Sequence, residues 1–181
     1  KGFKVPGIHA GAVSGPEQVV DHPLAGRKPE GQGCGQFFLV YAPDKKVVAA
    51  IHAGWRGTVK QIVAKTIRCM ADRYSCDPAL MMAGIAPSIS KEAFEVGEEV
   101  VDAFRETRVD MNRIMERNAQ TGKAHIDLWE ANRIQLLQSG LLPERIEVSG
   151  ICTYQHHEDF FSARRLGIKS GRILSGIMIK E

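Results

Sequence analysis

The chain has 181 residues, of which 44% are hydrophobic and 25% are charged. These values are ordinary for a globular protein and exclude a disordered or low-complexity chain. No stretch reaches the roughly 18 uninterrupted apolar residues that a membrane-spanning helix requires. The net charge of +3 is too small, and too evenly spread along the sequence, for a dedicated nucleic-acid binder. We therefore expect neither a membrane nor a nucleic acid as a partner.

The cysteines are too few for a disulfide scaffold in a chain of this size. They are Cys34, Cys69, Cys76 and Cys152, and no two of them form a Cys-x-x-Cys pair. The first residues of the chain contain no apolar signal core. These features predict a cytoplasmic protein whose thiols are free to act as metal ligands or nucleophiles.

The first predicted element is a β-hairpin. Residues 1–35 are rich in glycine and proline and lack a sustained period, which indicates an irregular segment. The apolar runs 37–41 and 47–51 have strand length, and a turn with proline and aspartate joins them. Because both runs are apolar throughout, we expect both faces of the hairpin to be covered.

Helices are predicted at 58–74 and 94–104, where apolar residues recur at three- and four-residue steps. After the second of these helices, residues 105–125 are polar and poorly periodic, which predicts an excursion or lid. Asp127 has capping-box spacing from Glu130 and begins another helix, for which Gly140 is a natural stop. The remaining predicted strands are 80–85, 146–153 and 172–179.

This order of elements predicts the fold class. Strands alternate with helices, but one strand pair is antiparallel. We therefore expect the α+β (mixed α/β) class, with a layered mixed β-sheet and helices packed on it. No linker divides the sequence, so a single domain is expected over residues 1–181.

The first candidate site is the segment 52–57, His-Ala-Gly-Trp-Arg-Gly. A strand end that meets a helix N-terminus is a common place for an anion or ligand. Gly54 and Gly57 permit close backbone approach, and the guanidinium of Arg56 is suited to phosphate or carboxylate. A capped turn with a surface arginine and a core tryptophan would give the same pattern without any function.

Cys34 is the second candidate, because it precedes the first strand of the hairpin while His52 closes the second strand. The two residues could therefore be neighbours in space. A thiolate beside an imidazole fits a Cys–His nucleophile pair, and it equally fits a soft site for zinc or copper. A buried, inert cysteine remains the alternative without chemistry.

The third candidate lies near the C-terminus, where Phe160 and Phe161 precede Arg164 and Arg165. Paired arginines could hold an anionic group while the aromatic rings pack under a base. An aromatic plug, with the arginines paired to surface acids, would explain the same pattern.

Three ordered motifs together resemble the laccase-domain family, and the resemblance runs from about Cys34 to the C-terminus. That family was named for multicopper polyphenol oxidase activity and is now usually described as purine nucleoside phosphorylase. The motifs are His-Ala-Gly-Trp-Arg-Gly at 52–57, Phe-Glu-Val-Gly-Glu-Glu-Val at 94–100, and Cys-Thr at 152–153 with Phe-Phe-Ser-Ala-Arg-Arg at 160–165 and Gly-Arg at 171–172.

The resemblance implies one zinc ion, or copper in the laccase description, held by two histidines and one cysteine. His52 matches the second histidine of the family, and Cys34 matches the cysteine, although the two residues before Cys34 are not the usual Ala-Asp. Candidates for the first histidine are His9 and His22, and His9 is favoured because small residues follow it. Relatives usually carry another strand in this region, so we expect a stretch to be missing before Cys34.

The implied activity is phosphorolysis of purine nucleosides such as adenosine and inosine, with hydrolytic deamination of adenosine at the same site. The predicted catalytic residues are Cys34, His52 and Arg56, and the predicted substrate-binding residues are Arg164, Arg165, Phe160 and Phe161. A copper-dependent polyphenol oxidase is one alternative, although the six histidines are few for several coppers. A metal-free Cys–His hydrolase and a non-catalytic metal-binding protein are the others.

Overall fold

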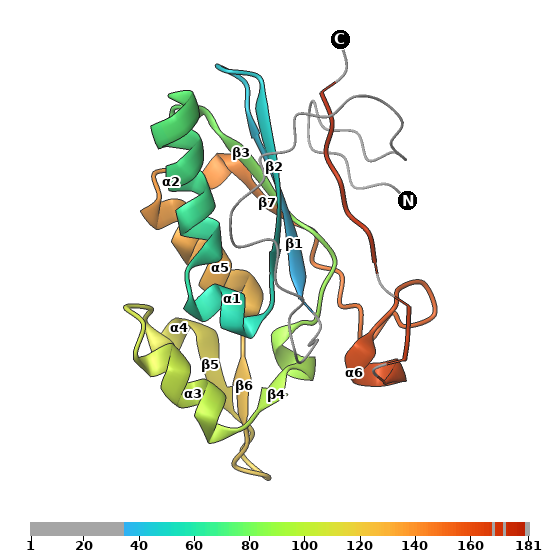
Figure 1. Ribbon diagram of the computed structural model, residues 1–181. Helices are drawn as coiled ribbons and strands as arrows, with labels where there is room; N and C mark the ends of the chain where they lie inside the picture. The colour runs from blue at the N-terminus through green and yellow to red at the C-terminus, as the bar shows by residue number, and fades with distance from the viewer. Residues whose placement is uncertain (1–34, 168, 172, 180–181) are drawn as a thin grey trace.

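The computed structural model describes residues 35–167, 169–171 and 173–179. Its main feature is a four-stranded sheet in the order β2-β1-β3-β7 (Figure 1). Strands β1 (Gln36–Ala42) and β2 (Val47–Ala53) form the predicted antiparallel hairpin. Strand β3 (Met82–Ile85) pairs antiparallel with β1 and parallel with β7 (Ile146–Val148). The sheet is thus mixed, and the predicted α+β class is confirmed.

Helices α2 (Ile62–Tyr74) and α5 (Leu128–Gln138) pack on one face of this sheet (Figure 1). Phe38 and Val40 of β1 are fully buried there, together with Ile67 and Met70 of α2. The opposite face is more open: Phe37 is only half-buried, and Ala50 and His52 are exposed. The prediction that both faces of the hairpin are covered is therefore wrong for β2. The apolar composition of a strand does not show whether helices cover one face of its sheet or both.

The helix predicted at 58–74 is interrupted. Helix α1 (Trp55–Val59) ends at Lys60, and α2 begins after Gln61. Gln61 adopts a left-handed conformation with φ of 57°, which an α-helix cannot contain. The predicted apolar face survives in α2, where Val63, Ile67 and Met70 are buried.

A second, three-stranded sheet has the order β4-β6-β5. Its strands are β4 (Glu95–Val96), β5 (Met115–Arg117) and β6 (Ala124–Ile126). Helices α3 (Glu98–Arg105) and α4 (Met111–Ile114) pack on it. Two predictions are wrong here: the segment 94–97 forms β4 and its flanks rather than the start of a helix, and residues 105–125 contain α4, β5 and the start of β6 rather than a lid. Strands this short give no detectable period-two pattern.

Helix α5 links the two sheets. Its N-cap is the predicted one, since the Asp127 carboxylate accepts a hydrogen bond from the main-chain N–H of Glu130 at 2.9 Å. Gly140 beyond its end has the left-handed φ of 98° expected of a helix stop. Leu128 and Ile134 pack in the core of the second sheet, whereas Leu136 packs in the core of the first.

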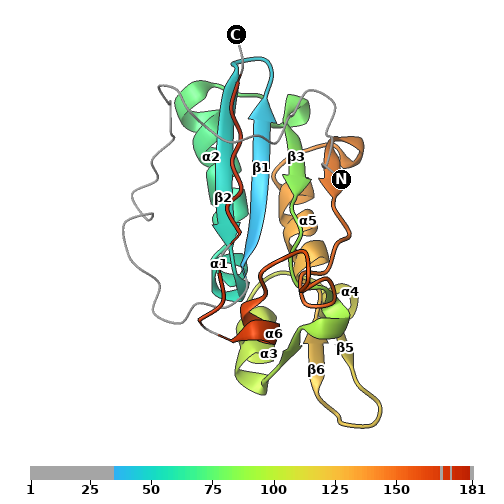
Figure 2. The same cartoon turned by 90° about the vertical axis from the view of Figure 1, so that its right-hand side faces the viewer.

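The C-terminal part contains less strand than expected. Strand β7 ends at Val148, and Cys152 forms only an isolated bridge with Ser88. Helix α6 (Ala163–Leu166) follows. Residues 173–179 form no strand, which corrects the prediction for 172–179, and Arg172 lies outside the described residues. Figures 1 and 2 show this segment on the open side of the first sheet, opposite α2. Short 3₁₀ turns occur at Pro78–Leu80, Lys91–Ala93 and Pro143–Arg145.

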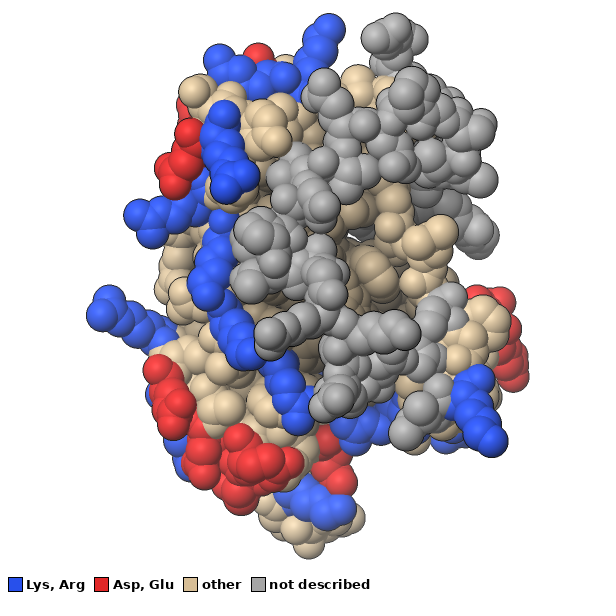
Figure 3. Space-filling view, in the orientation of Figure 1, with Lys and Arg blue, Asp and Glu red and all other residues tan. Residues whose placement is uncertain are grey.

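Charge is segregated on the surface although it is spread evenly along the sequence. Lysine and arginine side chains lie over α1 and α2, and acidic side chains gather over α3 (Figure 3). The exposed basic residues of α1, α2 and the link between them are Arg56, Lys60, Lys65, Arg68 and Arg73, and the exposed acids of α3 are Glu98, Glu99 and Asp102. Within the described ranges, no helix has the length and apolar content needed to cross a membrane.

Candidate active site

His52 lies near the end of β2, directly opposite Phe37 of β1 in the antiparallel register. The two rings are tilted by 47°, with their centroids 4.9 Å apart. A Cβ placed on Gly35 would lie 1.8 Å from Nε2 of His52. Only glycine therefore allows the backbone to lie against the imidazole in its present position. Because Gly35 directly follows Cys34 in the chain, the hairpin brings the backbone next to this cysteine into contact with His52.

The environment of His52 favours the neutral form of its imidazole over the charged form. Although His52 is exposed as a residue, desolvation of its ring by neighbouring protein atoms lowers its pKa below the ordinary value, because the charged form is less well solvated there. Among the described residues, neither ring nitrogen has a hydrogen-bond partner. A neutral, unpartnered imidazole can act as a metal ligand or as a general base.

The turn after His52 is held by Thr58. Gly54 is the N-cap of α1, and its carbonyl accepts hydrogen bonds from the main-chain N–H of Thr58 at 2.9 Å and from its hydroxyl at 3.1 Å. The guanidinium of Arg56 stacks over the ring of Trp55, with Cζ 4.4 Å from the centroid. Arg56 is exposed and pairs with no acid in the described part of the chain. Its five N–H donors are thus available to an anion.

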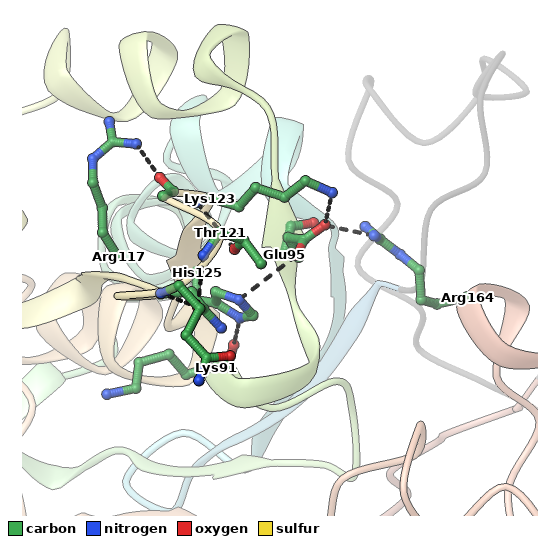
Figure 4. Close-up of polar contacts among 10 residues, drawn as sticks. Lys91, Glu95, Arg117, Thr121, Lys123, His125 and Arg164 are labelled. Carbon is green, nitrogen blue, oxygen red and sulfur yellow. Dashed lines mark hydrogen bonds and ion pairs between the residues drawn. The ribbon is translucent and has the colours of Figure 1, made fainter.

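The four residues predicted to contact substrate lie in or just before α6, and both arginines are engaged with the protein. Arg164 donates to the main-chain carbonyl of Glu95 at 3.1 Å and stacks on Phe94, as Figure 4 shows for the contact with Glu95. Arg165 lies over the ring of Tyr154. Phe160 is half-buried, and Phe161 is 54% exposed. Figures 1 and 2 place α6 at the end of the first sheet where β1 begins.

Two of the three predicted metal ligands, Cys34 and His9, lie outside the described residues, as does His22. Within residues 35–167, 169–171 and 173–179, no three histidine, cysteine or acidic side chains come together to hold a metal ion. The donor chemistry nonetheless fits a soft metal. The His52 ring nitrogens have no hydrogen-bond partner among the residues that the structure describes, and the glycine that contacts this ring directly follows Cys34 in the sequence.

The structure adds a group of buried polar residues that sequence reasoning missed. Asn132 and Gln135 of α5 lie beneath the turn after His52 and contact Thr58, and Asn132 also contacts Gln36 at the start of β1. All four are buried. The signal was present in the sequence, because Asn132 and Gln135 are polar residues three apart on the apolar face of a predicted helix.

Comparison with known proteins identifies the family. The family model described as multi-copper polyphenol oxidoreductase laccase matches residues 34–180. A purine nucleoside phosphorylase of Bacteroides thetaiotaomicron is 57% identical over 143 residues, which cover 79% of this chain and 53% of the relative. The adenosine deaminase RL5 of an unknown prokaryotic organism is 46% identical over 134 residues, or 74% of this chain and 51% of the relative.

Solved structures agree with this result. The crystal structure of YlmD from Geobacillus stearothermophilus matches 74% of this chain and 50% of its own chain, with a TM-score of 0.68 and 33% sequence identity. The chain thus spans about half the length of the curated relatives it matches. On the extent of the family match and the identity to these relatives, the chain belongs to the multi-copper polyphenol oxidoreductase laccase family.

Proposed function

We propose that this protein is a zinc-dependent purine nucleoside enzyme that phosphorolyses adenosine and inosine and deaminates adenosine. The observation that carries the proposal is the packing of the His52 imidazole against Gly35, the residue that follows Cys34; in the described part of the chain, neither ring nitrogen has a hydrogen-bond partner. Relatives named purine nucleoside phosphorylase and adenosine deaminase support both reactions. The reducing environment that a free thiolate ligand requires favours the cytoplasm.

The metal would be held by His52 and Cys34, with His9 as the proposed third ligand. A bound zinc ion supplies Lewis-acid chemistry that makes a water acidic enough to lose a proton near neutral pH. The lowered pKa of His52 favours the neutral imidazole, which is the form that binds a metal. Copper in the same ligand set is the alternative, and it would favour oxidation of phenols.

Phosphorolysis requires a cationic group that holds phosphate beside the ribose. Arg56 is the proposed group, because its guanidinium is exposed, stacked in place over Trp55 and free of acidic partners among the described residues. The stacking leaves the edge of the guanidinium available for a bidentate contact. The basic surface over α1 and α2 (Figure 3) also attracts anions toward this side of the molecule.

The purine is proposed to pack on Phe160 or Phe161. Phe161 is the more exposed ring, and it lies close against Gly171. Arg164 and Arg165 support this loop through their contacts with Glu95 and Tyr154. We propose that the positive charge of these two arginines, at the same end of the sheet, attracts the substrate.

The test is turnover of adenosine and inosine by protein of measured metal content, with and without phosphate. Chromatography resolves free base, ribose phosphate and deaminated nucleoside. We expect release of base that depends on phosphate and scales with zinc content. His52→Ala should abolish metal binding and both reactions. Arg56→Ala should raise the KM for phosphate at least 10-fold and leave deamination unchanged.

Arg73→Ala is the matched control for Arg56, because Arg73 is also exposed but lies at the far end of α2. It should alter neither reaction. Absence of turnover at full zinc occupancy would contradict the proposal. Turnover that survives metal removal but not Cys34→Ala would favour the metal-free hydrolase, and oxidation of phenols only with copper bound would favour the oxidase.

A further inference from the structure

Asn132 in α5 is fully buried, yet its side chain makes polar contacts with both chain segments of the candidate site. Its amide nitrogen donates to the hydroxyl of Thr58 at 2.9 Å, and that hydroxyl donates in turn to the carbonyl of Gly54. Two successive hydrogen bonds therefore connect α5 to the turn that follows His52.

The second contact of Asn132 is with the segment that follows Cys34. The side-chain amides of Asn132 and Gln36 lie 2.9 Å apart. The Gln36 amide group also lies against α5 itself, 3.2 Å from main-chain atoms of Leu128 and Trp129. Polar contacts thus hold Gln36, the first residue of β1, against α5.

A third contact strengthens the connection to α1. Gln135 lies one helical turn beyond Asn132 and donates from its side-chain nitrogen to the main-chain carbonyl of Thr58 at 2.8 Å. Thr58 is therefore contacted by α5 at its hydroxyl and at its carbonyl. The side-chain nitrogens of Asn132 and Gln135 are paired in this arrangement. Because a buried donor without a partner is costly, these contacts favour one relative position of the three elements.

We propose that Asn132 is a positioning residue that sets the separation of Gly35, the residue after Cys34, from His52, and thereby the metal affinity of the site. The inference rests on the proposed function in one respect, namely that Cys34 and His52 bind the metal. Its physical basis is that ligand distances must be correct to within about 0.2 Å. Groups that orient ligands from outside the first coordination sphere typically contribute about 10–100-fold in metal affinity.

The experiment uses the whole chain with Asn132→Leu, which has nearly the same volume and no hydrogen-bonding groups. Zinc affinity is measured by competition with a chromophoric chelator, and we expect it to fall about 10–100-fold. In cobalt-loaded protein, the thiolate-to-cobalt charge-transfer absorption should weaken or shift. Thr58→Val, a substitution of similar shape, should act in the same direction if Asn132→Leu does not fold.

A readout that needs no metal separates this inference from the proposed function. Metal-free wild-type protein should give a nuclear Overhauser cross-peak between the α protons of Gly35 and the His52 ring, and Asn132→Leu should lose it. Leu136→Ala is the control, since Leu136 is buried in the same helix but contacts neither segment by a polar group. It should lower stability while keeping both the cross-peak and the zinc affinity.

Each outcome decides the question. The inference is overturned if Asn132→Leu keeps the cross-peak and the wild-type zinc affinity, or if Leu136→Ala loses them to the same extent. It is also overturned if the wild type lacks the cross-peak. Wild-type protein that shows the cross-peak but neither binds zinc nor turns over nucleosides would instead refute the proposed function, and the cross-peak in Asn132→Leu would still decide the role of Asn132.

Discussion

At the scale of single residues, the site depends on Gly35. Its backbone occupies the space beside the His52 ring that any side chain would fill. Its φ lies outside the left-handed region, so an L-residue fits the backbone there. The conflict with a larger residue is therefore steric and involves only a side chain on the open face of the sheet.

Gly35→Ala should leave the fold intact and impair the site. Because His52 is exposed, its ring can rotate into solvent to make room for the methyl group. Replacing glycine also restricts the unfolded chain. We expect the free energy of unfolding to change by less than about 1 kcal/mol, while zinc affinity and phosphate-dependent turnover fall at least 10-fold. Chemical denaturation and chelator competition measure the two effects.

Gly176→Ala provides the comparison, because a Cβ on Gly176 would meet no atom within 4 Å. It should behave as wild type in both measurements. A Gly35→Ala protein with wild-type zinc affinity would show that the observed ring position is not the one that binds metal.

At the scale of elements, exposed ion pairs connect the strands of the second sheet with one another and with neighbouring segments. Lys123 contacts Glu95 at 2.7 Å, Arg117 contacts Glu98 at 2.7 Å, and Lys91 contacts Glu116 at 2.8 Å. Figure 4 shows Lys123, Arg164 and His125 around Glu95. Hydrogen bonds from the cationic partners lower the pKa of each of the three carboxyl groups.

These pairs predict a loss of stability in acid. A carboxyl group with a lower pKa in the folded state than in the unfolded state stabilises the fold above its unfolded pKa, which is about 4.3. That contribution disappears as pH falls through the lower folded value. We expect the melting temperature to fall below about pH 4.3, and to fall less steeply in the variant E95Q/E98Q/E116Q. Because the pairs are exposed, salt should also reduce the difference.

An equal slope of melting temperature against pH in the wild type and the triple variant would contradict this prediction. Calorimetry at matched ionic strength between pH 3 and pH 6 makes the comparison, and the difference between the two proteins at pH 6 provides the reference for the intact pairs.

The sequence predicted long elements better than short ones. The hairpin of β1 and β2 was predictable because two apolar runs flank a Pro-Asp turn, and α5 was predictable because Asp127 and Gly140 mark its limits. Strand β4 has two residues, which is too short for a period to appear. The break at Gln61 was not predictable, since a left-handed glutamine carries no compositional signal.

The site was predictable to a similar degree. The start of β1 places Gly35 beside His52, in keeping with the order of the two strands, whereas the predicted proximity of Cys34 itself concerns a residue outside the described ones. The contacts of Arg164 with Glu95 and Phe94 were not predictable, because they join segments 69 residues apart. The support of the site by Asn132 depends on a pairing with Gln36 across 96 residues, which no local pattern reveals.

At the scale of the whole molecule, the position of α5 between the two cores has a consequence for how the chain unfolds. Helix α5 packs against the second sheet through Leu128, Ala131 and Ile134, and against the first sheet through Leu136. Neither core can open without releasing part of this helix. The two sheets are therefore expected to form one cooperative unit, as two independently opening units would need separate helices.

Amide hydrogen exchange measures this coupling directly. Ala131→Gly should cost about 1 kcal/mol through helix propensity and should reduce protection in β1 and β2 by as much as in β5 and β6, although residue 131 packs only in the second core. Lower protection confined to the second sheet would contradict the prediction. With shared opening, any exposure of the turn after His52 by unfolding would be an event of the entire molecule, and the candidate site would keep its geometry for as long as the chain stays folded.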